Sequence, residues 1–270
     1  MRKTTETPDA LITLPDGRAI SYCDYGGPGG IPIFQFHGTP GSRIFGLDNE
    51  EVAKAGLRIL APERPGYGKS SPNPKATAVS DWVSDVDVLA DHLKLDRFHV
   101  IGVSGGGPFA LACAALLPQR VMTATVISSP SPMDFAGFWD NLSFFNRSLF
   151  YVSRSQPALL PAVCTALAML MKDRQGRPTH QGEAFRQGRI GIETDLKLLS
   201  REWNIPLESI AVPVFLWHGE RDTLASPTAA RELAKTIPAC ESHFVPGAGH
   251  FLSRDPLIAQ RVLDRILEAK

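Results

Sequence analysis

The chain has 270 residues, which is enough to bury the core of one sizeable domain. Lys and Arg together number 28 and so do Asp and Glu, so the net charge is zero with the seven histidines neutral. Nucleic acids and anionic membrane surfaces recruit proteins with a basic surplus, so this balance argues against either as the main partner.

Targeting and redox signals are weak along the whole chain. Residues 1–17 lack the apolar stretch of a signal peptide, and the longest apolar run, 158–171, is interrupted by Pro161 and is too short to span a bilayer. We therefore expect a cytoplasmic protein with no stable membrane insertion. The four cysteines are scattered without a C-x-x-C motif, which suggests buried thiols rather than a disulfide framework or a zinc site.

The predicted elements begin with two short β-like runs in residues 11–25. They flank the turn Pro15-Asp16-Gly17, a combination that favours a hairpin. Further along, apolar patterns and a helix-ending Gly56 predict a strand over 31–36, a helix over 50–55 and a strand over 57–61. Apolar positions spaced by three and four then predict an amphipathic helix over 79–95, with Ser80, Ser84 and Asp85 in its cap region.

The stretch 98–118, FHVIGVSGGGPFALACAALLP, predicts a buried strand that turns into a helix within a few residues. Ser104 stands at the apex of this turn, inside a G-x-S-x-G motif. Such a turn projects a serine hydroxyl toward a base but crowds the positions two before and two after it, where Gly102 and Gly106 carry no β-carbon. The pattern indicates a nucleophilic serine. The alternative is a glycine-rich turn with an idle serine.

The segment 133–205 has a different texture from the rest of the chain. It follows a β-rich run over 121–128, contains no convincing strand and is rich in Phe, Leu, Met and Ala at helical spacing. Breaks are expected near Pro157, Pro161 and Pro178. Its aromatic residues, among them Trp139 and Tyr151, are expected mostly to pack between elements, and a few to line an apolar pocket.

Two strands with polar loops complete the chain. Strands are predicted over 212–217 and 241–245, and helices over 226–237 and 256–270. The first strand leads into His218-Gly219-Glu220-Arg221-Asp222, and the second into Pro246-Gly247-Ala248-Gly249-His250.

These features resemble the α/β-hydrolase family over nearly the whole chain. The resemblance implies one α/β domain with a mostly parallel eight-stranded sheet, flanked by helices and covered by an inserted helical cap. The expected bounds are 1–132 and 206–270 for the two parts of the core and 133–205 for the cap.

The resemblance also implies a catalytic triad. Ser104 is expected to be the nucleophile, Asp222 the acid and His250 the base, in the chain order of this fold. Glu220 is a near competitor for the acid, and Asp134 marks an alternative position that some relatives use. His218 and His243 are expected to be structural.

Two backbone amides are expected to form the oxyanion hole. One is the amide of Gly105, and the other is that of Thr39 in the loop His37-Gly38-Thr39-Pro40, which resembles the family's H-G-x-P loop. His37 is expected to brace this loop rather than to act in catalysis.

The segment Arg64-Pro65-Gly66-Tyr67-Gly68-Lys69-Ser70 resembles a further landmark of the family. Its last three residues imitate the end of a phosphate-binding loop, but Glu63 stands where that motif needs a glycine. We therefore expect no nucleotide site, and no cofactor or metal.

A serine at the apex of the strand-to-helix turn favours attack on a carbonyl carbon, whereas related epoxide hydrolases and haloalkane dehalogenases use aspartate at that position. Hydrolysis of a small-molecule carboxylic ester with an apolar acyl group is the expected reaction, by a monomer or a homodimer. Three alternatives stay open: a carbon–carbon bond hydrolase, a non-catalytic ligand receptor, and a peptidase similar to proline iminopeptidases. The peptidase would need acidic cap residues to hold an amine, for which Glu183, Glu193, Asp195 and Glu202 are available, although charged cap residues are usually solvated.

Overall fold

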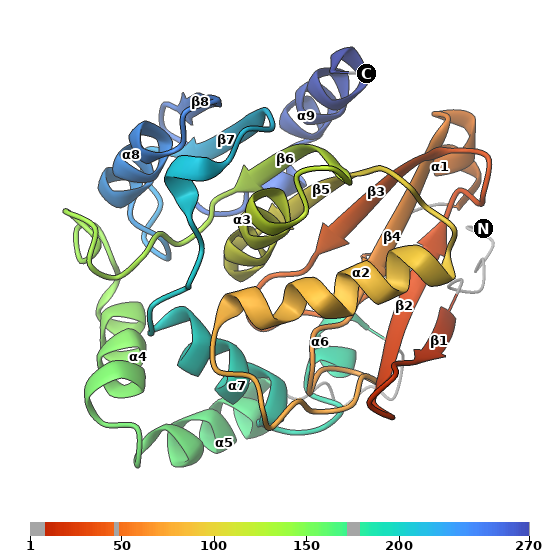
Figure 1. Ribbon diagram of the computed structural model, residues 1–270. Coiled ribbons are helices and arrows are strands. Elements are labelled where there is room, and N and C mark those ends of the chain that lie inside the picture. Colours follow the sequence, from red (N-terminus) through yellow and green to blue (C-terminus); the bar gives the residue numbers. More distant parts are fainter. Residues whose placement is uncertain (1–8, 46–48, 172–178, 270) are drawn as a thin grey trace, which may run out of the picture.

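Eight strands form one twisted sheet in the order β1-β2-β4-β3-β5-β6-β7-β8 (Figure 1). The computed structural model describes residues 9–45, 49–171 and 179–269. β1 pairs antiparallel with β2 and β2 antiparallel with β4, whereas the other neighbouring strands are parallel. The predicted mostly parallel, eight-stranded sheet is thus confirmed. The strands are β1 Asp9–Thr13, β2 Ala19–Tyr25, β3 Ile31–Phe36, β4 Leu57–Pro62, β5 Phe98–Val103, β6 Val121–Ile127, β7 Val214–Gly219 and β8 Cys240–Val245.

The N-terminal hairpin forms at the predicted turn. Thr13 pairs with Ala19 in the register of β1 and β2. The Gly17 N–H donates to the Leu14 carbonyl at 2.9 Å, and Gly17 has a φ of +86°, a conformation that suits glycine.

Helices cover both faces of the sheet (Figure 1). α1 (Asn49–Lys54) and α9 (Pro256–Glu268) pack on one face, where the apolar stripe of α9 joins a buried cluster with Phe215 and Trp217. On the other face, α2 (Trp82–His92), α3 (Gly107–Leu116) and α8 (Pro227–Thr236) share a larger buried cluster. The chain therefore forms three layers with the sheet in the middle.

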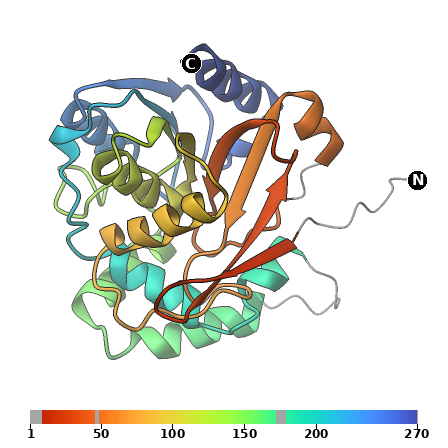
Figure 2. The ribbon, with the colours of Figure 1, turned by 45° about the vertical axis from the view of Figure 1, so that its right-hand side comes forward.

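Four further α-helices lie between β6 and β7 in the described part of the chain. They are α4 (Phe144–Ser155), α5 (Leu160–Met171), α6 (His180–Ala184) and α7 (Ile190–Leu199), and Figures 1 and 2 place them together beyond one end of the sheet. We propose that these helices form the cap predicted for 133–205; Pro178, one of its expected breaks, lies outside the described residues. Within the described part of the chain, no helix combines the length and the apolar character that crossing a membrane requires.

The predicted start of the helix before β5 is wrong. Residues 79–81 form a short 3₁₀ turn, and α2 begins only at Trp82. The Asp81 carboxylate accepts the backbone N–H groups of Thr77 at 2.6 Å and Ala78 at 3.1 Å. Asp85, expected near the cap, instead holds Arg18 with two hydrogen bonds of 2.6 and 2.7 Å. The Asp81 carboxylate therefore holds the start of the 3₁₀ turn, and α2 follows that turn without a side-chain cap.

Candidate active site

The turn after β5 forces an unusual backbone at Ser104. Its φ is +52°, and a 3₁₀ turn over Ser104–Gly106 leads directly into α3. A β-carbon on Gly102 would lie 2.4 Å from the Gly106 carbonyl oxygen, and one on Gly106 would lie 2.4 Å from that of Phe36. Only glycine fits at these two positions, which explains why the strained serine is bracketed by them.

Three loops that follow strands of the parallel part of the sheet meet at this serine. The His250 Nε2 lies 2.9 Å from the Ser104 Oγ, and the His250 Nδ1 lies 2.8 Å from the Asp222 Oδ2. Ser104 follows β5, Asp222 follows β7 and His250 follows β8. The structure thus brings together all three residues that the sequence suggested for a triad, at the spacing that proton transfer needs.

Asp222 is completely buried, and its carboxylate is fully engaged. The Oδ1 accepts the backbone N–H groups of Leu224 at 2.8 Å and Ala225 at 3.0 Å, while the Oδ2 also lies 3.3 Å from the His218 Nε2. Burial alone would raise the pKa of Asp222, but the hydrogen bonds with His218 and His250 outweigh burial and lower that pKa. The carboxylate is therefore ionised at neutral pH and can support a charged imidazole.

The competing candidates lie elsewhere. Glu220 is exposed and pairs with Arg231 at 2.8 Å, and Asp134 is also exposed. His243 stacks on Trp217 with ring centroids 4.1 Å apart. Since Asp222 is the carboxylate bonded to His250, neither Glu220 nor Asp134 holds the acid position.

The loop over 37–40, which is expected to supply one oxyanion donor, lies against the turn that carries Ser104. A β-carbon on Gly105 would be 2.2 Å from the Thr39 Oγ1 and 3.1 Å from the Thr39 nitrogen, so the two backbones are in close contact. A β-carbon on Gly38 would lie 3.8 Å from the Ser104 Oγ. The two amides expected to hold an oxyanion are therefore neighbours beside the serine hydroxyl.

A buried ion pair next to this loop was not predicted. Arg64 and Asp195 are each 1% exposed, and the Arg64 Nε and Nη2 lie 3.1 and 2.6 Å from the two Asp195 oxygens. Asp195 belongs to α7 and Glu183, also buried, belongs to α6, so the expectation that acidic cap residues are solvated is wrong for both. A signal was present, because Asp195 falls on the apolar side of α7 beside Ile192 and Leu196.

The segment that imitates a phosphate-binding loop is folded around a carboxylate. The Glu63 side chain is fully buried and accepts from the Lys69 backbone N–H at 3.0 Å and the Arg43 Nη1 at 2.7 Å. A β-carbon on Gly68 would lie only 1.9 Å from a Glu63 oxygen. The Glu63 carboxyl group therefore fills the space beside Gly68. The described residues contain no cluster of three His, Cys, Asp or Glu side chains that could hold a metal ion.

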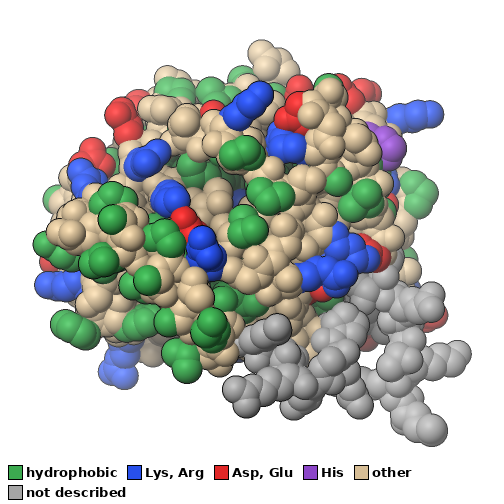
Figure 3. Space-filling model, turned by 90° about the horizontal axis from the view of Figure 1, so that it is seen from below, with side chains coloured by type: hydrophobic (Ala, Val, Ile, Leu, Met, Phe, Trp, Pro, Cys, Tyr) green, Lys and Arg blue, Asp and Glu red, His purple; other side chains and the backbone are tan. Residues whose placement is uncertain are grey.

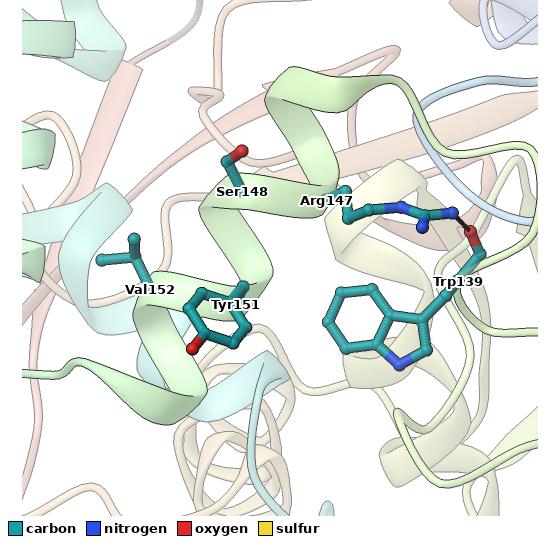
Figure 4. Close-up of a pocket in the computed structure, with 5 residues that line it drawn as sticks. All are labelled: Trp139, Arg147, Ser148, Tyr151 and Val152. Atoms are coloured by element: carbon teal, nitrogen blue, oxygen red, sulfur yellow. Dashed lines mark hydrogen bonds between the residues drawn. The ribbon is translucent and has the colours of Figure 1, made fainter.

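A groove of about 460 Å³ lies along α4 (Figure 4). Trp139 forms one wall, and Arg147, Ser148, Tyr151 and Val152 project from the helix. The predicted triad contributes no residue to its lining, so we do not assign this groove as an acyl pocket.

Comparison with known proteins defines the class. Residues 36–259 match the model of the alpha/beta hydrolase family, so the chain belongs to the α/β-hydrolase family.

Relatives within the family differ in their named activities. The chain is 26% identical to a non-heme haloperoxidase of Rhodococcus erythropolis over 89% of this chain and 92% of that protein. It is 34% identical to an acetyltransferase component of an acetoin cleaving system of Pseudomonas putida, over 42% of this chain and 30% of that protein. The chain spans less than half the length of several curated relatives that it matches.

Solved structures share the fold. A putative aryl esterase from Burkholderia cenocepacia superposes with a TM-score of 0.74 at 19% identity, covering 97% of this chain and 98% of that one. A haloalkane dehalogenase from Bradyrhizobium elkani gives a TM-score of 0.71 at 22% identity, with the same two coverages. At these identities the likeness shows the fold alone.

Proposed function

We propose that the protein is a serine hydrolase that cleaves a carboxylic ester through an acyl-enzyme. The observation that carries this proposal is the unbroken chain of hydrogen-bonding distances, 2.9 Å from Ser104 to His250 and 2.8 Å from His250 to Asp222. A serine hydroxyl is a weak nucleophile, and it becomes reactive only when a neighbouring base can take its proton.

In the first step the Ser104 Oγ attacks the ester carbonyl carbon while the His250 Nε2 takes the hydroxyl proton. The ionised Asp222 holds the imidazole in the tautomer with a hydrogen on Nδ1 and supports its positive charge. The carbonyl oxygen becomes an oxyanion that the Thr39 and Gly105 amides can bind. The carbon–oxygen bond to the alcohol then breaks, and His250 protonates the departing alkoxide.

In the second step water attacks the acyl-serine ester. His250 takes a proton from the water, a second oxyanion forms at the same two amides, and the bond to the Ser104 Oγ breaks. The serine recovers its proton from His250 and the carboxylic acid is released. The net reaction consumes one water and needs no cofactor or oxidant.

An ester fits this site better than a peptide with a free amino terminus. A peptidase of that kind needs unpaired carboxylates in the cap, but Glu183 pairs with Arg43 at 2.6 Å and Asp195 with Arg64 at 2.6 Å. Glu193 is held by both Arg189 and Lys197, at 2.8 and 2.7 Å. These three acidic residues therefore already have cationic partners, and the fourth candidate, Glu202, lies exposed on the surface.

Hydrolysis of p-nitrophenyl esters of graded acyl length tests the proposal. We expect turnover by the wild type and a loss of roughly a thousandfold or more in kcat for Ser104→Ala. Ser84→Ala, at an exposed position on α2, is the matched control and should retain wild-type rates. Turnover that survives in Ser104→Ala would exclude this serine as the nucleophile, and a wild type inactive on every ester would exclude esterase activity.

A further inference from the structure

The proposed oxyanion donor of Thr39 belongs to a peptide unit whose other end is clamped. The Gly38 carbonyl and the Thr39 N–H lie in one planar, trans peptide, so fixing the direction of the carbonyl also fixes that of the N–H. The Gly38 oxygen lies 3.0 Å from the Arg64 Nη2 and 2.8 Å from the His37 Nδ1. Two donors on the carbonyl therefore determine where the Thr39 N–H points.

The hydrogen bonds of His37 define its role in this clamp. The Arg64 backbone N–H donates to the His37 Nε2 at 3.2 Å, so the ring hydrogen is on Nδ1 and is donated to the Gly38 oxygen. Burial, together with the positive charge of Arg64, holds the pKa of His37 well below its usual value. The ring stays neutral in this one tautomer, which agrees with the bracing role expected from the sequence.

Arg64 owes its own direction to the cap. Its Nε and Nη2 bind both oxygens of Asp195 on α7, and its Nη1 donates to the His37 carbonyl at 2.5 Å. A two-bond contact of this kind fixes the guanidinium plane as well as its position. Removing one partner of such a buried pair would leave the other charge uncompensated.

Asp195 also holds Thr39 directly. Its Oδ2 accepts the Thr39 hydroxyl at 2.5 Å and the Tyr67 hydroxyl at 2.9 Å. The same carboxylate thus contacts the residue that carries the N–H and, through Arg64, determines the direction of the carbonyl that precedes it.

We propose that Asp195 is a positioning residue through which the cap sets the oxyanion hole. It holds the Gly38–Thr39 peptide in the orientation that turns the Thr39 N–H toward the developing oxyanion. Without Asp195, Arg64 and the Thr39 hydroxyl lose their common partner, and only the His37 Nδ1–H still holds the Gly38 carbonyl. The peptide can then rotate and present its carbonyl oxygen, which would repel the oxyanion. This inference rests on the proposed function, because the oxyanion forms only if Ser104 attacks a carbonyl.

The test compares two substitutions that each break a buried ion pair between cap and core. Asp195→Asn keeps the shape of the side chain but removes its charge. We expect kcat for p-nitrophenyl butyrate to fall about 100-fold with KM changed less than about threefold, because the missing donor acts mainly on the transition state. Glu183→Gln, on α6, breaks the pair with Arg43 and should change neither parameter more than about threefold.

A second variant keeps every charge in place. Thr39→Val retains the backbone amide and removes only the hydroxyl that Asp195 accepts, so we expect a fall in kcat of about tenfold. Thermal unfolding of each variant shows whether it is folded. If Asp195→Asn does not fold, the kinetic comparison is made with Thr39→Val instead. An equal loss in Glu183→Gln, or an unchanged kcat in both Asp195→Asn and Thr39→Val, would overturn the inference.

A crystal structure of Asp195→Asn separates this inference from the proposed function. We expect the Gly38–Thr39 peptide to be rotated or to occupy two orientations. A peptide that keeps its wild-type orientation would overturn the positioning role, whether or not the wild type hydrolyses esters. A wild type without ester turnover would overturn the proposed function alone.

Discussion

Two helices of similarly apolar composition, α3 in the core and α5 in the proposed cap, differ sharply in burial. Residues 107–114 of α3 are all buried, whereas α5 buries only Leu160, Cys164 and Ala168. The exposed fractions of Met169 and Leu170 on α5 are 69% and 82%. Position in the fold, rather than composition, decides burial: α3 packs on the sheet beside α2, and α5 lies in the outer group of helices.

Buried apolar contacts hold the core and also join the cap to it, because Phe150 of α4 and Leu198 of α7 belong to the same buried cluster as α2 and α3. The core is stabilised mainly by buried apolar area. Figure 3 views the molecule from below, the side on which Figure 1 places α5, and this surface carries many hydrophobic side chains beside Lys and Arg. The cap is also joined to the core by directional polar contacts, including Asp195 with Arg64, Glu183 with Arg43, and the Gln187 amide with the Ser70 carbonyl at 2.7 Å. Hydrogen-bonded contacts of this kind are directional, and the positioning role that we propose for Asp195 requires such a contact.

The largest expected effect concerns the core loop that carries the acid. Asp222→Asn should lower kcat for a p-nitrophenyl ester by roughly a thousandfold or more, because an amide no longer supports the imidazolium or enforces its tautomer. Glu220→Gln, two residues away and exposed, is the matched control and should stay near wild type. A loss below tenfold in Asp222→Asn would show that another group supports His250.

The burial difference between the helices predicts unequal stability effects for the same substitution. Leu111→Ala on α3, at a fully buried position, should lower the free energy of unfolding by about 2–5 kcal/mol. Leu170→Ala on α5 should change it by less than about 0.5 kcal/mol. Urea unfolding of both variants measures this. Equal losses would mean that α5 is covered in solution.

Acid should weaken the core through His99. Burial lowers the pKa of this side chain to about 4, and the Nδ1 lies 2.8 Å from the Thr123 Oγ1. The unfolded chain, in which a histidine pKa is about 6.5, takes up the proton first, so stability falls as the pH drops from about 6.5 toward 4.

Replacing this histidine should flatten that dependence. Between pH 7 and pH 4.5, the unfolding free energy of the wild type should fall by about 2–3 kcal/mol more than that of His99→Gln. His92→Gln, at an exposed position on α2, is the control for a solvated histidine. A difference that stays constant with pH would contradict a buried neutral His99.

Much of the fold and the candidate nucleophile Ser104 could be predicted because the signals are local, whereas Asp222 and His250 were implied by the resemblance to the α/β-hydrolase family. Ser104, Asp222 and His250 lie one, three and five residues beyond the ends of their strands, and parallel strands bring their carboxyl ends to one edge of a sheet. Arg64 and Asp195 could not be paired in advance, since 131 positions separate them and only the packing of α7 joins them. The start of α2 was misplaced for a smaller reason, because propensity alone does not distinguish a 3₁₀ turn from the first turn of an α-helix.

The acyl-enzyme itself is the most direct test of the central claim. The protein is mixed with p-nitrophenyl butyrate, quenched in acid during turnover and digested for mass spectrometry. We predict one butyryl group on the peptide that contains Ser104, and none on the corresponding peptide of Ser104→Ala. Turnover without an adduct on that peptide, or an adduct on a different side chain that forms at the rate of turnover, would contradict the proposed mechanism.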